Sequence, residues 1–260
     1  MKRIHILSFG ALIALALASC SSADRKNDLE RFGIKGPVKQ ITELIQSRSL
    51  DSLVLSSDPS DERTEFDVMR VMDFYPNGLI KNLRVITEDG TLVQKYTYDQ
   101  DSLLTEMQSF ADGQPGTYET YEYDSKGRQT NITVYDPKGT ALLTIDSEYD
   151  RHGNVVLKFS RDPKTKMTRK EYFKYNDRNQ LIETTSSDNG RDAKLSTSYQ
   201  YNEYGDISVQ TETDSLFDVY SIAQNFVYRD RDSLGNWGGR EIIVNDMVTQ
   251  KVERTIEYYE

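Results

Sequence analysis

The sequence predicts an all-β protein, a single antiparallel β-meander of about fourteen strands curled into a flattened barrel or a superhelical wrap. Three observations predict this fold class. A phrase of the form YEYDSKGRQ returns along the chain about every 25 residues. The segments between its copies alternate apolar and polar residues, which is the period of a strand. Gly, Asn, Asp and Pro gather at both ends of these segments, as they do in tight turns.

The first 19 residues have the pattern of a signal peptide. Lys2 and Arg3 precede an apolar run over residues 6–18 that is too short to span a bilayer comfortably. The run ends in Leu-Ala-Ser-Cys, which resembles the lipobox of bacterial lipoproteins. The resemblance implies cleavage before Cys20, acyl chains such as palmitate on that cysteine, and attachment to the membrane through them.

The segment after the cysteine predicts a tether and a location. Ser21 stands where an aspartate would favour the inner membrane in enteric-type sorting, so an outer-membrane lipoprotein of the cell envelope is expected. Residues 20–32 are predicted to form the lipidated tether, with one short helical turn over residues 27–33. Residues 33–260 are then predicted to form a single repeat domain, in which residues 50–64 lack clean alternation.

The repeat places an aromatic residue, an Asp or Asn and a glycine at fixed positions in each copy. Alternation predicts that the aromatic residues point into the core rather than toward a ligand. The core aromatics are Phe74, Tyr98, Tyr123, Tyr149, Tyr175 and Tyr201. The turn residues that follow them are Asp99, Asp124, Asp150, Asn176 and Asn202, with the glycines Gly78, Gly127, Gly153, Gly205 and Gly235.

The local chemistry of these positions predicts a hairpin with a bulge in each unit. Asp or Asn at the first turn position accepts hydrogen bonds from backbone N–H groups ahead of it. The glycine supplies the left-handed conformation that closes the turn, and Asn179 tolerates the same conformation. Ser102 stands in the glycine position of the first tyrosine copy, so a strained or differently shaped turn is expected there.

The length of the predicted sheet requires it to curl. With about seven units and ~4.8 Å between strands, a flat sheet would leave a wide apolar face in water. Strands also twist by roughly 20–25° relative to their neighbours, so large open sheets fold over. The faces that carry the tyrosines are therefore expected to turn inward.

The repeat phrase, Tyr-Asp-x-x-Gly with an aromatic residue two positions before it, resembles the YD repeats of Rhs-type proteins over residues 66–260. The opening GIKGPVKQITE (33–43) and the closing stretch 232–259, together with the lipobox, resemble repeat-bearing envelope lipoproteins of Gram-negative anaerobes. The resemblance implies extended β-sheets that curl around an interior, and some members carry a sugar-binding label. Encapsulation of a cargo domain does not transfer, because no such domain follows the repeats.

Composition disfavours several classes of function. The chain has 32 Lys and Arg against 42 Asp and Glu, a net charge of −10, and shows no basic stripe, so nucleic-acid binding is not expected. Cys20 is its only cysteine, and His152 lies in a predicted turn. Asp99 with Asp101 does not match the ligand spacing of a calcium loop. No metal, cofactor or enzymatic activity is therefore predicted.

Aromatic residues outside the repeat register are the candidate ligand contacts: Trp237, Tyr118, Tyr172 and Tyr204. Such rings can stack on sugar faces or meet a protein partner, although for Trp237 covering the end of the core is the preferred interpretation. Three hypotheses follow. The first is an outer-membrane lipoprotein that binds a polysaccharide or another envelope protein. The second is a structural or assembly lipoprotein without a small-molecule ligand, and the third is a glycan-active enzyme with paired carboxylates.

Overall fold

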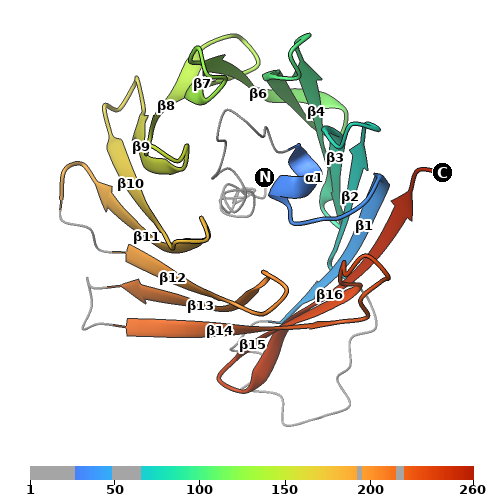
Figure 1. The fold of residues 1–260 in the computed structure, drawn as a ribbon. Coiled ribbons are helices and arrows are strands. Elements are labelled where there is room, and N and C mark those ends of the chain that lie inside the picture. The colour runs from blue at the N-terminus through green and yellow to red at the C-terminus, as the bar shows by residue number, and fades with distance from the viewer. Residues whose placement is uncertain (1–26, 49–65, 192–194, 215–219) are drawn as a thin grey trace.

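The computed structural model describes residues 27–48, 66–191, 195–214 and 220–260 (Figure 1). The predicted signal peptide, the lipidation site Cys20 and the segment 50–64 lie outside these residues.

Short hydrogen-bonded hairpins make up nearly all of the described chain. One helix, α1 (Asp28–Arg31), precedes the strands. The strands in chain order are β1 (Val38–Ser47), β2 (Val68–Phe74), β3 (Ile80–Thr87), β4 (Gly90–Tyr98), β5 (Leu104–Ala111), β6 (Gln114–Tyr123), β7 (Gln129–Tyr135), β8 (Ala141–Tyr149), β9 (Val155–Arg161), β10 (Thr168–Tyr175), β11 (Leu181–Asp188), β12 (Leu195–Tyr201), β13 (Ile207–Asp214), β14 (Tyr220–Arg229), β15 (Gly239–Val244) and β16 (Met247–Tyr258).

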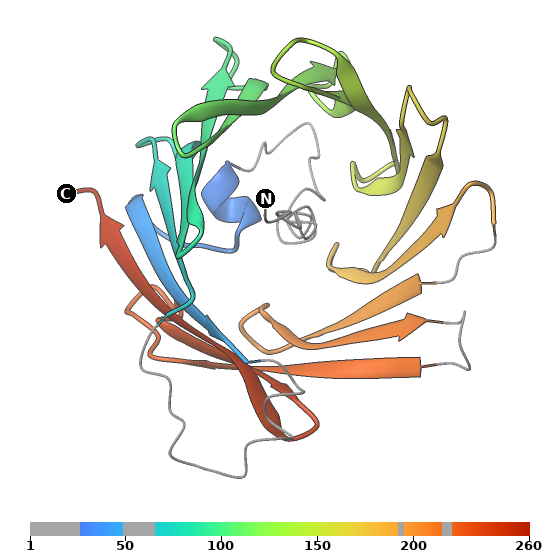
Figure 2. The same ribbon diagram turned by 180° about the vertical axis from the view of Figure 1, so that it is seen from behind.

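The predicted antiparallel meander is confirmed, and it closes into a barrel (Figures 1 and 2). Each strand pairs with its sequence neighbours, and β1 pairs with β16, so the sheet formed by the described strands has no open edge. The described residues contain sixteen strands rather than about fourteen. The repeat units account for β2–β15, whereas β1 and β16 flank the repeats and form the closing pair.

The seven repeat turns lie at one end of the barrel. They join β2 to β3, β4 to β5 and so on to β14 and β15, and alternate connections in a meander fall on the same side. Beside six of these turns the strand pairing contains a β-bulge. At the second turn, for example, Thr97 pairs with Glu106, but the next residue, Tyr98, pairs with Leu104, so one residue of β5 is skipped. This end, which contains residues 75–79, 99–103, 124–128, 150–154, 176–180, 202–206 and 232–236, is called the tyrosine mouth below.

Helix α1 lies inside the ring of strands in both views (Figures 1 and 2). It has the expected short helical turn, but residues 27–32 do not form a free tether, because Leu29 is only 4% exposed within the core. The cluster around Leu29 contains Ile34, Val38, Ile41, Met72, Phe74, Ile80 and Leu83. The apolar core therefore fills one side of the barrel, where α1 packs against the inward faces of β1–β3.

Candidate functional site

The turn residues have one common geometry. The Oδ1 atom of Asp99 accepts hydrogen bonds from the backbone N–H groups of Asp101 and Leu103, each at 2.9 Å. The same pair of bonds recurs at Asp124, Asp150, Asn176, Asn202 and Asp232. Ser102 adopts the left-handed conformation of the glycine positions, with φ 62°, so its turn is strained rather than differently shaped. The Oδ1 atoms of these side chains are therefore already engaged in closing the turns.

The repeat tyrosines form a ladder of hydroxyl groups around the tyrosine mouth. Each hydroxyl donates to the backbone carbonyl of the residue that begins the second strand of the preceding hairpin, at 2.6–2.9 Å. The donor–acceptor pairs are Tyr98–Ile80, Tyr123–Leu104, Tyr149–Gln129, Tyr175–Val155, Tyr201–Leu181 and Tyr228–Ile207. We call this the tyrosine ladder; each bond contributes about 1 kcal/mol to stability.

Burial keeps the ladder in its donating, neutral form. It raises the pKa of Tyr123 to about 12 and that of Tyr201 to about 12. Phe74 occupies the first repeat position and has no hydroxyl, but its carbonyl accepts from Tyr259 at 2.6 Å. Tyr259, after the last strand, thus makes the same kind of hydroxyl-to-carbonyl bond on the side where β1 and β16 close the barrel.

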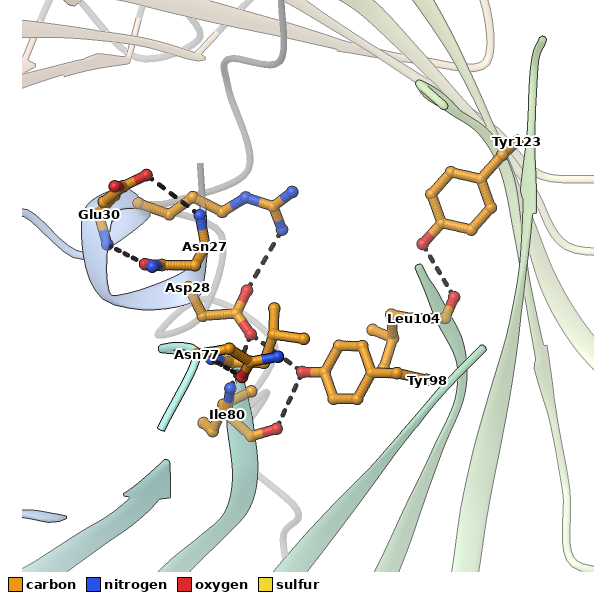
Figure 3. A network of polar contacts seen from close by, with 10 residues as sticks. Asn27, Asp28, Glu30, Asn77, Ile80, Tyr98, Leu104 and Tyr123 are labelled. Atoms are coloured by element: carbon orange, nitrogen blue, oxygen red, sulfur yellow. Dashed lines mark hydrogen bonds and ion pairs between the residues drawn. The ribbon is translucent and has the colours of Figure 1, made fainter. Parts of the chain in front are cut away.

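Asp28 of α1 connects the N-terminal segment to this ladder (Figure 3). Its carboxylate accepts from the backbone N–H of Ile80 at 2.8 Å and from the hydroxyl of Tyr98 at 2.9 Å. Burial, with the Asp28 charge adding to it, raises the pKa of Tyr98. Asn27 caps the helix in a capping box with Glu30 and lies over the turn at Gly78. The start of the described chain is therefore fixed inside the tyrosine mouth.

A pocket of about 400 Å³ opens at the tyrosine mouth between the first two repeat turns. The rings of Tyr75 and Tyr98 meet edge to face, with centroids 6.5 Å apart. Tyr96 belongs to the same lining, and its hydroxyl donates to Gln94 at 2.9 Å. The polar side chains of the lining are Asn77, Thr97, Asp99 and Ser102. Aromatic faces and hydrogen-bonding groups thus converge on one concave surface, which we call the mouth pocket.

A second group of side chains gathers inside the barrel at the closing strands. Glu43 is 3% exposed and lies between Arg70, at 3.0 Å, and Arg254, which bonds it through Nε and Nη2 at 2.9 and 2.6 Å. The Arg254 guanidinium lies 3.2 Å from the centroid of the Trp237 ring, and that of Arg240 lies 5.3 Å away. We call these five residues the arginine cluster.

Burial and charge oppose each other in the arginine cluster. Burial alone would raise the pKa of Glu43, but Arg254 and Arg70 outweigh it and hold that pKa below its ordinary value. Burial lowers the pKa of Arg254, Glu43 opposes this shift, and Arg240 and Arg70 add to it. The arginines thus keep the carboxylate charged while repelling one another.

The aromatic residues predicted as ligand contacts are not brought together. Trp237 is only 7% exposed inside the barrel, so it is not part of an exposed aromatic patch. Tyr118 stacks on Tyr135 with ring centroids 4.8 Å apart, on the outer face of the sheet. Tyr172 is exposed on the outer face of β10, and Tyr204 lies in a turn beneath the Arg231 guanidinium, 4.0 Å from it.

Sequence reasoning missed the residues that do converge. Tyr75 directly follows the repeat aromatic Phe74, and Tyr96 shares its face with Tyr98, so both looked like ordinary members of the repeat. Arg254 carried a clearer signal. It stands between Val252 and Ile256 on the inward face of β16, where an apolar residue is expected.

No metal cluster and no membrane-spanning helix is found within the described ranges. No group of three or more His, Cys, Asp or Glu side chains in these ranges is arranged to hold a metal ion. None of their helices is long and apolar enough to cross a bilayer.

Comparisons with known proteins show a likeness of fold. No family model matches the chain, and no curated protein matches it. A porin-like protein from Bacteroides uniformis is similar in structure with a TM-score of 0.54 and 12% identity, over 85% of this chain and 97% of that one. A chain of the Photorhabdus luminescens Tc holotoxin pore matches at a TM-score of 0.28 and 9% identity, over 72% of this chain and 12% of that one. The first likeness supports the β-barrel fold, and the second is too weak to support any inference.

Proposed function

We propose that this protein is an outer-membrane lipoprotein of the cell envelope, acylated at Cys20, whose barrel binds a polysaccharide at the mouth pocket. The observation that carries the proposal is the convergence of Tyr75, Tyr96 and Tyr98 with Asn77 and Asp99 in a concavity of about 400 Å³. Sites for small ligands combine apolar or aromatic walls with a few polar groups that fix orientation. The flat face of a sugar stacks on an aromatic ring, and its hydroxyl groups bond to amide and carboxylate side chains.

The outer face of the barrel supports attachment by an acyl chain rather than by a lipid-facing wall. Strand positions that point away from the interior carry ion pairs, such as Lys174–Glu183 at 2.8 Å and Arg229–Glu241 at 2.7 Å. The lipid-facing positions of membrane barrels are apolar instead. The repeat architecture and the lipobox agree with the proposed relationship to YD-repeat envelope lipoproteins.

The position of α1 gives the anchored barrel a preferred orientation. Asn27 lies at the tyrosine mouth, against the turn at Gly78. Cys20 precedes it by seven residues, a chain that spans at most about 25 Å when extended. The mouth pocket is therefore expected to lie close to the membrane, within reach of glycans attached to it.

Glycan binding is tested with the chain from Ser21 onward, which retains every described element. Tyr75→Ala removes a ring that is 38% exposed in the mouth pocket, and Tyr172→Ala removes a comparably exposed ring, 41%, on the outer face. On a glycan array, the Tyr75 variant is expected to lose at least tenfold in affinity, whereas the Tyr172 variant retains wild-type binding. Equal binding by both variants would locate the site elsewhere. If no glycan binds the wild type and pulldown from envelope extracts retains nothing, the structural or assembly role becomes the better account.

Lipidation has an independent readout. Cells labelled with a palmitate analogue are expected to incorporate it into the wild-type protein and not into a Cys20→Ala variant, because that residue is the only cysteine in the chain. Label in the variant would contradict acylation at this position.

A further inference from the structure

The arginine cluster occupies four neighbouring strands around the seam of the barrel. In spatial order these are β2, β1, β16 and β15, which contribute Arg70, Glu43, Arg254 and Arg240. Glu43 stands directly opposite Arg70 on one side and Arg254 on the other. The closing pair β1–β16 brings Arg70 and Glu43 beside Arg254 and Arg240 on the inner face of the barrel.

Positive charge exceeds negative charge in this group, in which Glu43 is buried, Arg254 nearly so, and Arg70 and Arg240 are half-buried. Three guanidinium groups surround one carboxylate, and the Arg254 side chain is only 10% exposed. Arg240 has no carboxylate in the cluster to itself and reaches the amide oxygen of Gln250 at 3.4 Å. The nearby Arg231 does not change the balance, because it pairs with Asp206. Uncompensated buried charge is strongly unfavourable, so this arrangement favours an additional anion.

Two hydrogen-bond donors in the cluster have no acceptor among the residues that the structure describes. They are Nη1 of Arg254 and Nε of Arg240, both buried atoms. Arg254 already uses Nε and Nη2 on Glu43, so Nη1 is the donor it has left. Both guanidiniums lie beside the Trp237 ring, which restricts their positions. An ion-pair network accounts for Arg70, Glu43 and Arg254. Arg240 is held by the rings of Phe226 and Trp237 and by Gln250, but its charge has no carboxylate partner in the cluster and the two donors have no acceptor.

We propose that Arg240 and Arg254, supported by Arg70, form an anion-binding site inside the barrel for an oxyanion. Guanidinium groups bind carboxylate and sulfate oxygens through strong charge-assisted hydrogen bonds. In the context of the proposed function, on which this choice of ligand rests, the oxyanion is the carboxylate or sulfate of an acidic glycan. A free inorganic oxyanion has the same chemistry and is distinguished by experiment. The protein thus carries a cationic interior site within a chain of net charge −10.

The chain supplies its own reporter for this site, because Trp237 is its only tryptophan. We expect trigalacturonate, added to the chain from Ser21 onward, to change the Trp237 fluorescence saturably. Neutral maltotriose is expected to leave it unchanged, and inorganic sulfate tests the free anion. Arg240→Gln is expected to weaken trigalacturonate binding at least tenfold while preserving the Glu43–Arg254 pair. Arg229→Gln, on the outer face of the adjacent strand β14, is the matched control and is expected to bind as the wild type does.

The outcomes separate this site from the mouth pocket. Loss of binding in Arg240→Gln but not in Arg229→Gln supports the anion site. A saturable response to sulfate as well as trigalacturonate, both weakened by Arg240→Gln, supports it with a free oxyanion as a ligand. If trigalacturonate binding is lost in Tyr75→Ala and unchanged in Arg240→Gln, the result supports glycan binding at the mouth pocket and contradicts the anion site. No fluorescence response to either anion also overturns it, whatever the neutral glycans show.

Discussion

Two sides of the same barrel are stabilised in different ways. On the packed side, formed by α1, β1–β3 and β16, inward residues such as Ile41, Phe74 and Val252 are almost completely buried. On the open side, formed by β8–β13, Val155 is the only strand residue that is fully buried. Inward positions there carry Thr184, Thr197 and similar side chains, which line a small pocket of about 130 Å³.

The difference shows that a repeat can hold a sheet together without filling its interior. Whereas the β2–β3 hairpin of the packed side carries Phe74 and Tyr75 in the repeat positions, the open side has Asx turns and the tyrosine ladder at each of its hairpins. These contacts act between neighbouring hairpins, so they close each repeat onto the previous one. Apolar burial is concentrated where the two ends of the chain meet, because closure there relies on strands that are distant in sequence.

The largest expected difference between the two sides is the effect of removing a phenylalanine. Phe74→Ala is expected to lower the free energy of unfolding by about 3–5 kcal/mol, because the ring is 2% exposed in the core. Phe173→Ala, at a half-buried inward position of β10, is expected to lower it by only about 1–2 kcal/mol. Urea unfolding of both variants measures the difference. Equal losses would mean that the open side is packed as tightly as the other.

Two turn glycines provide a narrower comparison. Gly78→Ala is expected to destabilise by about 3 kcal/mol, because its φ is 81° and an added Cβ would lie 2.5 Å from the Asn27 side chain. Gly205 has φ 85° and open space around it, so Gly205→Ala is expected to lose only about 1 kcal/mol. Thermal unfolding distinguishes them. If the Gly78 variant is no worse than the Gly205 variant, α1 does not depend on that turn.

A tyrosine of the ladder is expected to contribute more to the free energy of unfolding where it contacts α1 than elsewhere in the barrel. Tyr98→Phe removes the hydroxyl whose single proton is shared between the Asp28 carboxylate and the Ile80 carbonyl, with a loss of about 2 kcal/mol because one acceptor is charged. Tyr175→Phe removes one bond to the Val155 carbonyl, with a loss of about 1 kcal/mol. Chemical denaturation is the measurement. A double variant combining Tyr98→Phe and Asp28→Asn should lose less than the sum, since the two groups are in contact.

A dependence of stability on alkaline pH is expected as well. Because burial raises the pKa of Tyr201 from 10 to about 12, its contribution to stability is complete below pH 10. That contribution is lost as the pH rises through about 12, where the folded protein also ionises. Unfolding measured between pH 9 and 12 should show the decline, and Tyr201→Phe should reduce it. A pH profile unchanged by the substitution would contradict the buried hydroxyl.

Much of this architecture is readable from short stretches of sequence. Asp124 and Gly127 specify a turn through bonds within five residues, and the alternation around them specifies which face turns inward. The mouth pocket was not readable, because Tyr75 and Tyr96 are separated by a hairpin and meet only through strand pairing. The burial of Trp237 at the core was one of the two interpretations that the sequence offered, but its partners Ile45 and Val252 lie in strands distant from it in sequence and could not be named.

The sequence by itself determined the antiparallel repeat, its turns and the inward direction of its tyrosines, because those features depend on hydrogen bonds and alternation within one or two hairpins. Only the tertiary structure decided that β1 and β16 close the sheet, that α1 lies inside it, and that Glu43 meets Arg254 from 211 residues away. Such contacts follow from the accumulated twist and stagger of all the strands, which no local pattern encodes.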